Sequence, residues 1–183
     1  ARRGRGRLDR RGLAIEVEEN GDTYEANATL KAIAYARASG FLSLADDSGI
    51  EVDALDGRPG VRSARYGTPD LDDAGRTALL LHELEGVPPP LRTARYVAVV
   101  ALVDPSIPGE PKAVLFRGVQ EGCISSAPRG TRGFGYDPVF LVDGQDASAT
   151  TQAELAEAAK DAISHRGQAL RAARSYLQEH YGC

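Results

Sequence analysis

Adjacent carboxylates follow an apolar run in the first third of the chain, within the segment Asp46-Asp47-Ser48-Gly49. The run from Phe41 to Ala45 has strand character, so we expect the carboxylates at a strand end, over the sheet edge where ligands bind in α/β folds. There they could bind Mg²⁺ together with substrate phosphates, and one could accept a proton from an attacking water molecule. The alternative is a turn in which Asp and Gly serve only the backbone.

Lysine is rare in this chain, because most of the positive charge is on arginine and the only lysines are Lys31, Lys112 and Lys160. Lys31 lies with Asn27 on the mostly apolar stripe of a predicted helix. A buried ammonium there would need an anion, and phosphate is one such partner. Alternatively, the stem of Lys31 follows the edge of the stripe and its head group stays in water.

The glycine-rich stretch from Gly130 to Pro138 sets aromatic rings between glycines. Glycine permits a close approach of the backbone, and stacking of a base on an aromatic ring contributes about 1–3 kcal/mol. Phe134 and Tyr136 could therefore form a shelf for a purine. The alternative is that these rings anchor a structured loop to the core.

The segment Ser164-His165-Arg166 begins the last predicted helix, with Ser164 as its N-cap. An arginine in the first turn is disfavoured by the helix dipole, so local stability does not account for Arg166. His165 and Arg166 could donate hydrogen bonds to phosphate or to a carbonyl-bearing base. A solvated arginine remains the alternative.

The helices that position these residues follow from periodicity and end signals. The first is predicted over 22–39, with capping-box spacing between Asp22 and Glu25 and a stop at Gly40. Others are expected over 70–85, near 151–160 and from Ser164 onward. In the last helix we expect a face that packs on the sheet; its members are Leu170, Ala173, Leu177 and Tyr181.

The strands are expected between these helices. Tyr96 to Val103 is nearly continuous and rich in valine, as in a strand covered on both faces, and Ala113 to Phe116 is its expected partner. A further extended piece covers Ile50 to Leu55. The alternation of helices and strands predicts an α/β, or mixed α+β, fold with a central mixed sheet flanked by helices.

Composition restricts the class of protein. The chain has 183 residues, 42% hydrophobic and 26% charged, which predicts one domain over 13–183 after an irregular arginine-rich lead-in over 1–12. No apolar run approaches the roughly 20 residues of a membrane helix, and a net charge of −4 argues against binding a nucleic acid polymer. Two cysteines without metal-type spacing indicate a reducing compartment, and we expect the cytoplasm.

Taken in order, these pieces resemble the inosine triphosphate pyrophosphatase family, from about Glu18 to Leu177. The matching segments are 18–24, Asn27-Ala28 with Lys31-Ala32, 45–49, 57–66, 133–138 and 160–166. The resemblance implies an elongated mixed α/β fold with a nucleotide cleft between two lobes, usually as a homodimer. It also implies Mg²⁺-dependent hydrolysis of ITP, dITP and XTP, in which water attacks the α-phosphate and releases nucleoside monophosphate and pyrophosphate.

The resemblance further implies roles for individual residues. Asp47 would be the general base and a Mg²⁺ ligand, and Glu18 would be a second metal contact. The residues implied to bind substrate are Lys31, Ser48, Phe134, Gly135, Tyr136, Asp137, Lys160, His165 and Arg166. Donors aimed at a 6-oxo group, for which we expect His165 and Arg166, would discriminate against ATP by as much as about 10⁴–10⁵.

Two features depart from the family pattern. Members of the family begin with a strand that leads into a Thr/Ser-x-Asn-x-x-Lys phosphate loop, which residues 1–12 do not match, and Ala26 stands where the family has Glu. One alternative is therefore a protein that binds nucleotides without hydrolysing them. Another is a related pyrophosphatase acting on modified or pyrimidine nucleotides.

Overall fold

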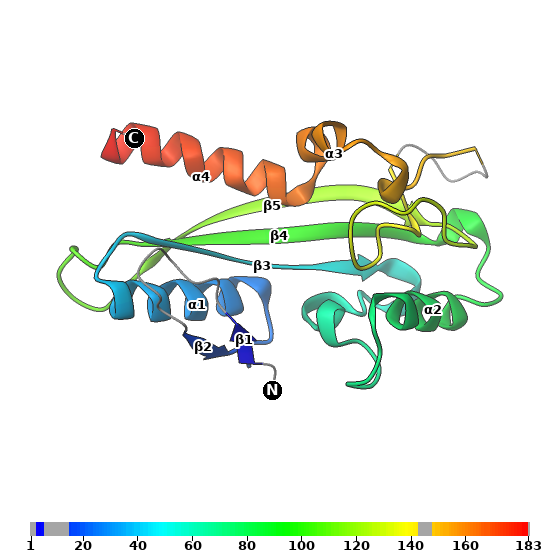
Figure 1. The fold of residues 1–183 in the computed structure, drawn as a ribbon, viewed down its shortest axis with the longest axis horizontal. Helices are drawn as coiled ribbons and strands as arrows, with labels where there is room; N and C mark the ends of the chain where they lie inside the picture. The colour runs from blue at the N-terminus through cyan, green and yellow to red at the C-terminus, as the bar shows by residue number, and fades with distance from the viewer. Residues whose placement is uncertain (1–2, 6–14, 143–147, 183) are drawn as a thin grey trace. The chain divides into compact units, whose positions relative to one another are not determined.

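The computed structural model describes residues 3–5, 15–142 and 148–182. Its described strands form a two-stranded sheet, β1-β2, and a four-stranded sheet in the order β3-β4-β5-β6, with β5 and β6 antiparallel. Helices flank the central sheet, so the α/β class is confirmed (Figure 1). The elements are β1 (Arg3–Arg5), β2 (Glu16–Glu18), α1 (Tyr24–Ser39), β3 (Ser43–Val52), α2 (Asp73–Glu83), β4 (Thr93–Val103), β5 (Ala113–Ile124), β6 (Phe140–Leu141), α3 (Glu157–Ile163) and α4 (His165–Tyr181), with short 3₁₀ helices η1 (Asp53–Leu55), η2 (Gly60–Arg65), η3 (Pro89–Leu91) and η4 (Gln152–Glu154).

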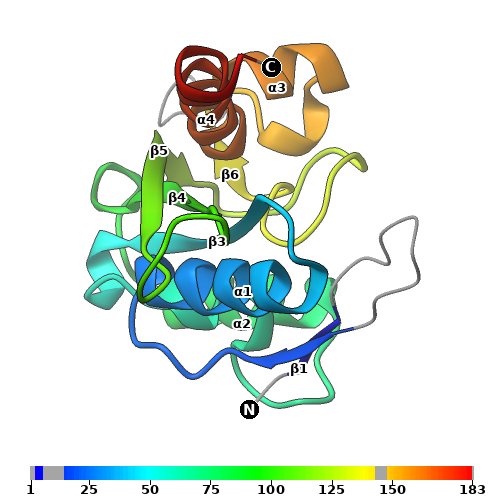
Figure 2. The same cartoon turned by 90° about the vertical axis from the view of Figure 1, so that its left-hand side faces the viewer.

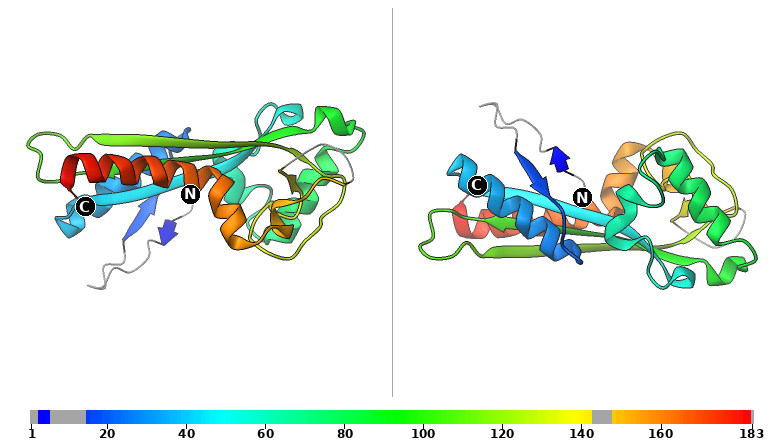
Figure 3. Two further views of the ribbon diagram at one scale, coloured as in Figure 1. Left: turned by 90° about the horizontal axis from the view of Figure 1, so that it is seen from above. Right: turned by 90° about the horizontal axis from the view of Figure 1, so that it is seen from below.

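The chain divides into two compact units. Unit 1 comprises Ala1–Asp47, Ala98–Arg117 and Ala169–Cys183, and unit 2 comprises Ser48–Val97 and Gly118–Gln168. The long strands β3, β4 and β5 and helix α4 each contribute residues to both units, and Figure 3 shows the course of the two longest strands, β4 and β5. The single domain over 13–183 stays a prediction. No helix of the described segments is long and apolar enough to cross a membrane.

In unit 1, α1 and α4 cover opposite faces of the strands (Figure 2). Helix α1 starts one residue later than a cap at Asp22 would set, because the Thr23 hydroxyl accepts the Ala26 N–H at 3.1 Å, and it ends at Gly40 as predicted. Part of the expected lead-in is ordered: β1 pairs antiparallel with β2, with Arg3 opposite Glu18. The rest of 1–12 lies outside the described residues.

The packing face of α4 differs from the prediction. Ala169 and Ala173 are buried against Ala98 and Val100 of β4, whereas Leu170 and Tyr181 are exposed. Small alanines let the helix backbone approach the valine-rich strand, which leaves the larger side chains at the edge of the contact. The prediction was therefore right for Ala173 and wrong for Leu170 and Tyr181.

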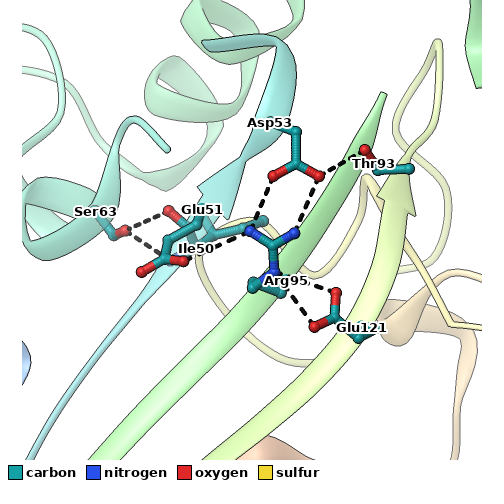
Figure 4. Close-up of polar contacts among 7 residues, drawn as sticks. All are labelled: Ile50, Glu51, Asp53, Ser63, Thr93, Arg95 and Glu121. Atoms are coloured by element: carbon teal, nitrogen blue, oxygen red, sulfur yellow. Dashed lines mark hydrogen bonds and ion pairs between the residues drawn. The ribbon is translucent and has the colours of Figure 1, made fainter. Parts of the chain in front are cut away.

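Strand β3, which runs from unit 1 into unit 2, continues through the carboxylate segment, and this corrects both expectations for it. Asp46 to Gly49 lie within the strand, neither at its end nor in a turn. The reason is the apolar sequence that follows, because Ile50 and Val52 are fully buried in the core of unit 2. The Ser63 hydroxyl, which accepts the Ile50 N–H at 2.8 Å, holds the strand in place (Figure 4).

Candidate active site

Asp47 is the centre of a polar cluster in unit 1. Its Oδ1 accepts a hydrogen bond from Lys31 Nζ at 3.0 Å and its Oδ2 accepts one from Asn27 Nδ2 at 3.2 Å. Burial raises the pKa of the Asp47 carboxyl, while Lys31 and Asn27 act in the opposite direction. A half-buried carboxylate whose proton affinity is raised is suited to accept a proton from water.

Helix α1 presents both donors on one face, because Asn27 and Lys31 are one turn apart. Asn27 is fully buried, and its Oδ1 accepts the Gly21 N–H at 2.9 Å, so the same side chain holds the loop before the helix. A Cβ at Gly21 would lie 2.8 Å from Asn27 Oδ1, which leaves no room for a side chain. Asn27 therefore links Asp47 to the loop before α1.

A second carboxylate faces the same ammonium group. Glu19 lies 3.4 Å from Lys31 Nζ, whereas its neighbour Glu18, the predicted metal contact, is exposed at the end of β2. Glu19 and Asp47 thus converge on a point that already holds a positive charge. Two converging carboxylates fit Mg²⁺, which takes its other ligands from water and substrate phosphates. In the described segments, no group of three or more His, Cys, Asp or Glu side chains is placed to hold a metal ion.

Asp137 organises the glycine-rich loop of unit 2. This buried carboxylate accepts hydrogen bonds from Tyr96 Oη at 3.2 Å, from the Phe134 N–H at 2.9 Å and from Lys160 Nζ at 2.6 Å. Gly133 has a φ of 81°, and a Cβ there would lie 2.0 Å from Asp137 Oδ2. The glycine is therefore required for the loop to close around the carboxylate.

The closed loop leaves Phe134 exposed, with 60% of its surface accessible, between two cations. Lys160 Nζ lies 4.8 Å from the centre of the ring, and the Arg166 guanidinium lies 5.7 Å from it. Arg166 also donates to the Ser48 hydroxyl at 2.9 Å. An exposed ring flanked by two cations can bind a flat, electron-rich group that carries acceptors or negative charge.

The other residues predicted in the loop and at the start of α4 are buried or hydrogen-bonded within the protein. Tyr136 is buried and its hydroxyl donates to the Ser63 carbonyl at 2.9 Å, so this ring anchors the loop to the core. The Gly135 N–H donates to Asp73 Oδ2 at 2.8 Å, which ties the loop to the first turn of α2. His165 is buried too, and its ring stacks on Tyr96 with 4.7 Å between centroids. Ser164 caps α4 as predicted, since its hydroxyl accepts the Gly167 N–H at 3.0 Å.

Asp47 is the last residue of the first segment of unit 1, and Ser48, the next residue in the chain, is the first residue of unit 2. Lys31 and Asp47 belong to unit 1, and Ser48, Phe134, Asp137, Lys160 and Arg166 belong to unit 2. The sequence matches the profile of the Ham1 family over residues 6–176. This chain belongs to the Ham1 family.

Individual relatives extend the Ham1 match. A protein of Exiguobacterium sibiricum named "dITP/XTP pyrophosphatase" is 48% identical over 169 residues, which are 92% of this chain and 82% of that protein. One of the same name from Geobacter sulfurreducens is 49% identical over 91% of this chain and 78% of its own length. The solved structure of a HAM1 protein from Coxiella burnetii has a TM-score of 0.79 at 41% identity, covering 89% of this chain and 80% of that one.

Three residues that contact these clusters are not among the site residues predicted from the sequence. The sequence indicates Asn27 only as a polar neighbour of Lys31 and as part of a matching segment, although its position one turn before Lys31 predicts that both reach the same partner. The resemblance implies Glu18 as the second metal contact, whereas the structure places its neighbour Glu19 beside Lys31. Tyr96 was assigned only to a buried strand, where a hydroxyl that must find a partner was the available signal.

Proposed function

We propose that this protein hydrolyses non-standard purine nucleoside triphosphates such as ITP, dITP and XTP to the monophosphate and pyrophosphate. The observation that carries the proposal is the identity of 48–49% over more than nine-tenths of the chain to proteins named dITP/XTP pyrophosphatase. Three features support it: Asp47 as a general base, Lys31 as a cation for the phosphates, and the exposed ring of Phe134 as a surface on which the purine can stack.

In the reaction, a water oxygen attacks the α-phosphorus and a bond forms between them. The bond from the α-phosphorus to the oxygen bridging the α- and β-phosphates breaks, and pyrophosphate leaves with that oxygen. Asp47 accepts the proton of the attacking water, since both its oxygens are held in fixed orientation by Lys31 and Asn27. Lys31 places positive charge where the phosphates carry negative charge.

We expect Mg²⁺ to be held by Asp47 with Glu19 or Glu18, and to neutralise phosphate charge in the transition state. Glu19 is favoured by its place beside Lys31, and Glu18 by the family resemblance. Ser48 and Arg166 are also expected to contact the substrate, because the Arg166 guanidinium donates to the Ser48 hydroxyl.

The purine is expected to stack on Phe134, with Lys160 and Arg166 at the ring. Their N–H groups suit the 6-oxo group of hypoxanthine or xanthine, whereas the amino group of adenine would leave a donor facing a donor. His165 is buried and its ring stacks on Tyr96, so it would affect the purine indirectly, through Tyr96 and Asp137. Gly135, Tyr136 and Asp137 hold the loop rather than the base.

Two further expectations belong to this proposal: a homodimer and a cytoplasmic location suited to the nucleotide pool. The alternative of a silent nucleotide-binding protein is not favoured, because the relatives are named as pyrophosphatases and Asp47 has the environment of a base. Activity on pyrimidine or modified nucleotides is less well supported, since the relatives' names specify dITP and XTP.

The test is pyrophosphate release from ITP, dITP, XTP and ATP with Mg²⁺, by the wild-type chain and by Asp47→Ala. We expect the 6-oxopurine substrates to be cleaved at least about 10²-fold faster than ATP, and Asp47→Ala to lose about 10²–10⁴ in rate. Asp53→Ala is the matched control, because Asp53, the first residue of η1, pairs with Arg95 of β4 outside this site. Equal rates for Asp47→Ala and wild type would refute the assigned base.

A further inference from the structure

Two buried glutamines face each other beneath the glycine-rich loop of unit 2. Gln120 of β5 donates from Nε2 to Oε1 of Gln152 in η4 at 2.7 Å. In the described part of the chain, Gln120 Oε1 and Gln152 Nε2 are buried without a hydrogen-bond partner. Buried amide atoms left unpaired lower stability, so the pair is a costly way to fill this space.

Gln152 belongs to the turn on which the loop rests. The Ala153 N–H, next in the chain, donates to the Asp137 carbonyl at 3.1 Å. On the other side, the Thr151 hydroxyl donates to the Arg129 carbonyl at 2.9 Å, and the Arg132 N–H donates to the Ala153 carbonyl at 3.2 Å. A displacement of Gln152 would therefore move the backbone at both ends of the loop.

Gln120 lies beside Tyr96, whose hydroxyl donates a hydrogen bond to the Asp137 carboxylate. The Ile124 N–H donates to the Arg92 carbonyl at 2.8 Å, and this antiparallel register places Gln120 opposite Tyr96 on the neighbouring strand. The Tyr96 hydroxyl donates to Asp137 Oδ1, and its ring carries His165. The glutamine hydrogen bond thus joins η4, which holds the Asp137 backbone, to β5, the strand next to the one whose Tyr96 holds the Asp137 carboxylate.

We infer that Gln120 and Gln152 form a positioning pair that sets base specificity by fixing Asp137, and through it Phe134 and Lys160. The inference rests on the proposed function, because it concerns the same base site. Neither glutamine is a catalytic residue. The pair affects the positions in which the Phe134 ring and the Lys160 ammonium meet the purine. Proteins tolerate costly buried polar groups of this kind at functional sites.

The test compares Gln120→Met, Gln152→Met and the double variant with wild type, since Met has a similar shape without the amide. Each single variant leaves the partner's amide without its hydrogen bond and should melt at a lower temperature, whereas the double variant should melt near the wild-type temperature. The double variant should nevertheless show a KM for ITP raised about fivefold, kcat within about twofold and a reduced ITP-to-ATP ratio of kcat/KM.

The outcomes separate the two proposals. If wild type cleaves ITP and the stable double variant keeps the wild-type KM and ITP-to-ATP ratio, the positioning role is refuted and the proposed function stands. If wild type neither cleaves nor binds ITP, with binding measured by calorimetry, both are refuted. A double variant that melts as wild type but binds ITP more weakly supports the inference, because a purely structural pair would not alter affinity while leaving stability unchanged.

Discussion

The two units each contain an Asp–Lys pair, and the pairs differ in how fully the carboxylate is satisfied. In unit 2, Asp137 is 3% exposed at its side chain and accepts from Lys160 at 2.6 Å, from Tyr96 and from the Phe134 N–H. In unit 1, Asp47 is 11% exposed and accepts from Lys31 at 3.0 Å and from Asn27. Glu19 competes with Asp47 for the same lysine.

This difference distinguishes a carboxylate that anchors a loop, Asp137, from the proposed general base, Asp47. Three donors and nearly complete burial commit Asp137 to holding the loop. Asp47 keeps acceptor capacity on both oxygens, and burial raises its pKa despite the nearby ammonium, so it can take up a proton. A third pair in unit 2 joins Asp53 of η1 to Arg95 of β4, and Asp53 is 44% exposed (Figure 4). A hydrogen bond from Arg95 lowers the pKa of the Asp53 carboxyl, whereas burial raises that of Asp47.

The largest expected effect comes from removing the charge of each buried carboxylate in turn. Asp47→Asn should lower kcat for ITP by about 10²–10⁴ with little change in melting temperature, because the base is lost and the shape is kept. Asp137→Asn should instead lower the melting temperature and raise KM, because the loop loses its anchor. Steady-state kinetics and thermal unfolding on the same preparations measure both.

Similar behaviour of the two variants would contradict the different roles assigned to Asp47 and Asp137. A low kcat with normal stability for Asp137→Asn would mean that Asp137 takes part in the chemistry. Unchanged kcat for Asp47→Asn would remove the base from unit 1.

The sequence predicted the members of these pairs but not the pairing. Lys31, Asp47, Asp137 and Lys160 were each candidates, and the end of α1 at Gly40 and the cap of α4 at Ser164 were correct because such signals are local. The pairing spans 16 residues in one case and 23 in the other, and no local pattern specifies contacts at that distance.

The path of β3 could not be predicted for a related reason. Asp46 to Gly49 has the composition of a turn, and only the burial of Ile50 and Val52 in the core carries the strand through it. Tyr136 shows the same limit, since its spacing with Phe134 suggested two rings of one kind. The fold buries Tyr136 and exposes Phe134.

A smaller effect is expected from removing the cation of each pair. Lys160→Met leaves the almost fully buried Asp137 without its ion partner and should lower the free energy of unfolding by about 3 kcal/mol. Lys31→Met should cost only about 1 kcal/mol, because Asp47 is nearer to solvent and keeps Asn27. Urea unfolding at neutral pH compares the two.

The matched control is Lys112→Met, a change at an exposed lysine, which should leave the unfolding midpoint unaltered. A loss for Lys31→Met equal to that for Lys160→Met would contradict the ranking by burial and make the unit 1 cluster as much an anchor as Asp137.

The smallest effect is expected at the exposed pair, where its dependence on pH identifies its cause. The pKa of Asp53 is lower in the folded chain than its ordinary value of 3.8, so its ionisation stabilises the fold above that value, and the gain is lost as the pH falls through the lowered pKa. Asp53→Asn should therefore cost about 0.5 kcal/mol at pH 7, where solvent screens the pair, and nothing once the wild-type carboxyl is protonated. Urea midpoints of both proteins across this range, with and without 1 M salt, measure the difference. A difference that persists in acid would show that Asp53 acts through its hydrogen bond with Thr93 rather than through charge, and exposure would then not be what separates the three pairs.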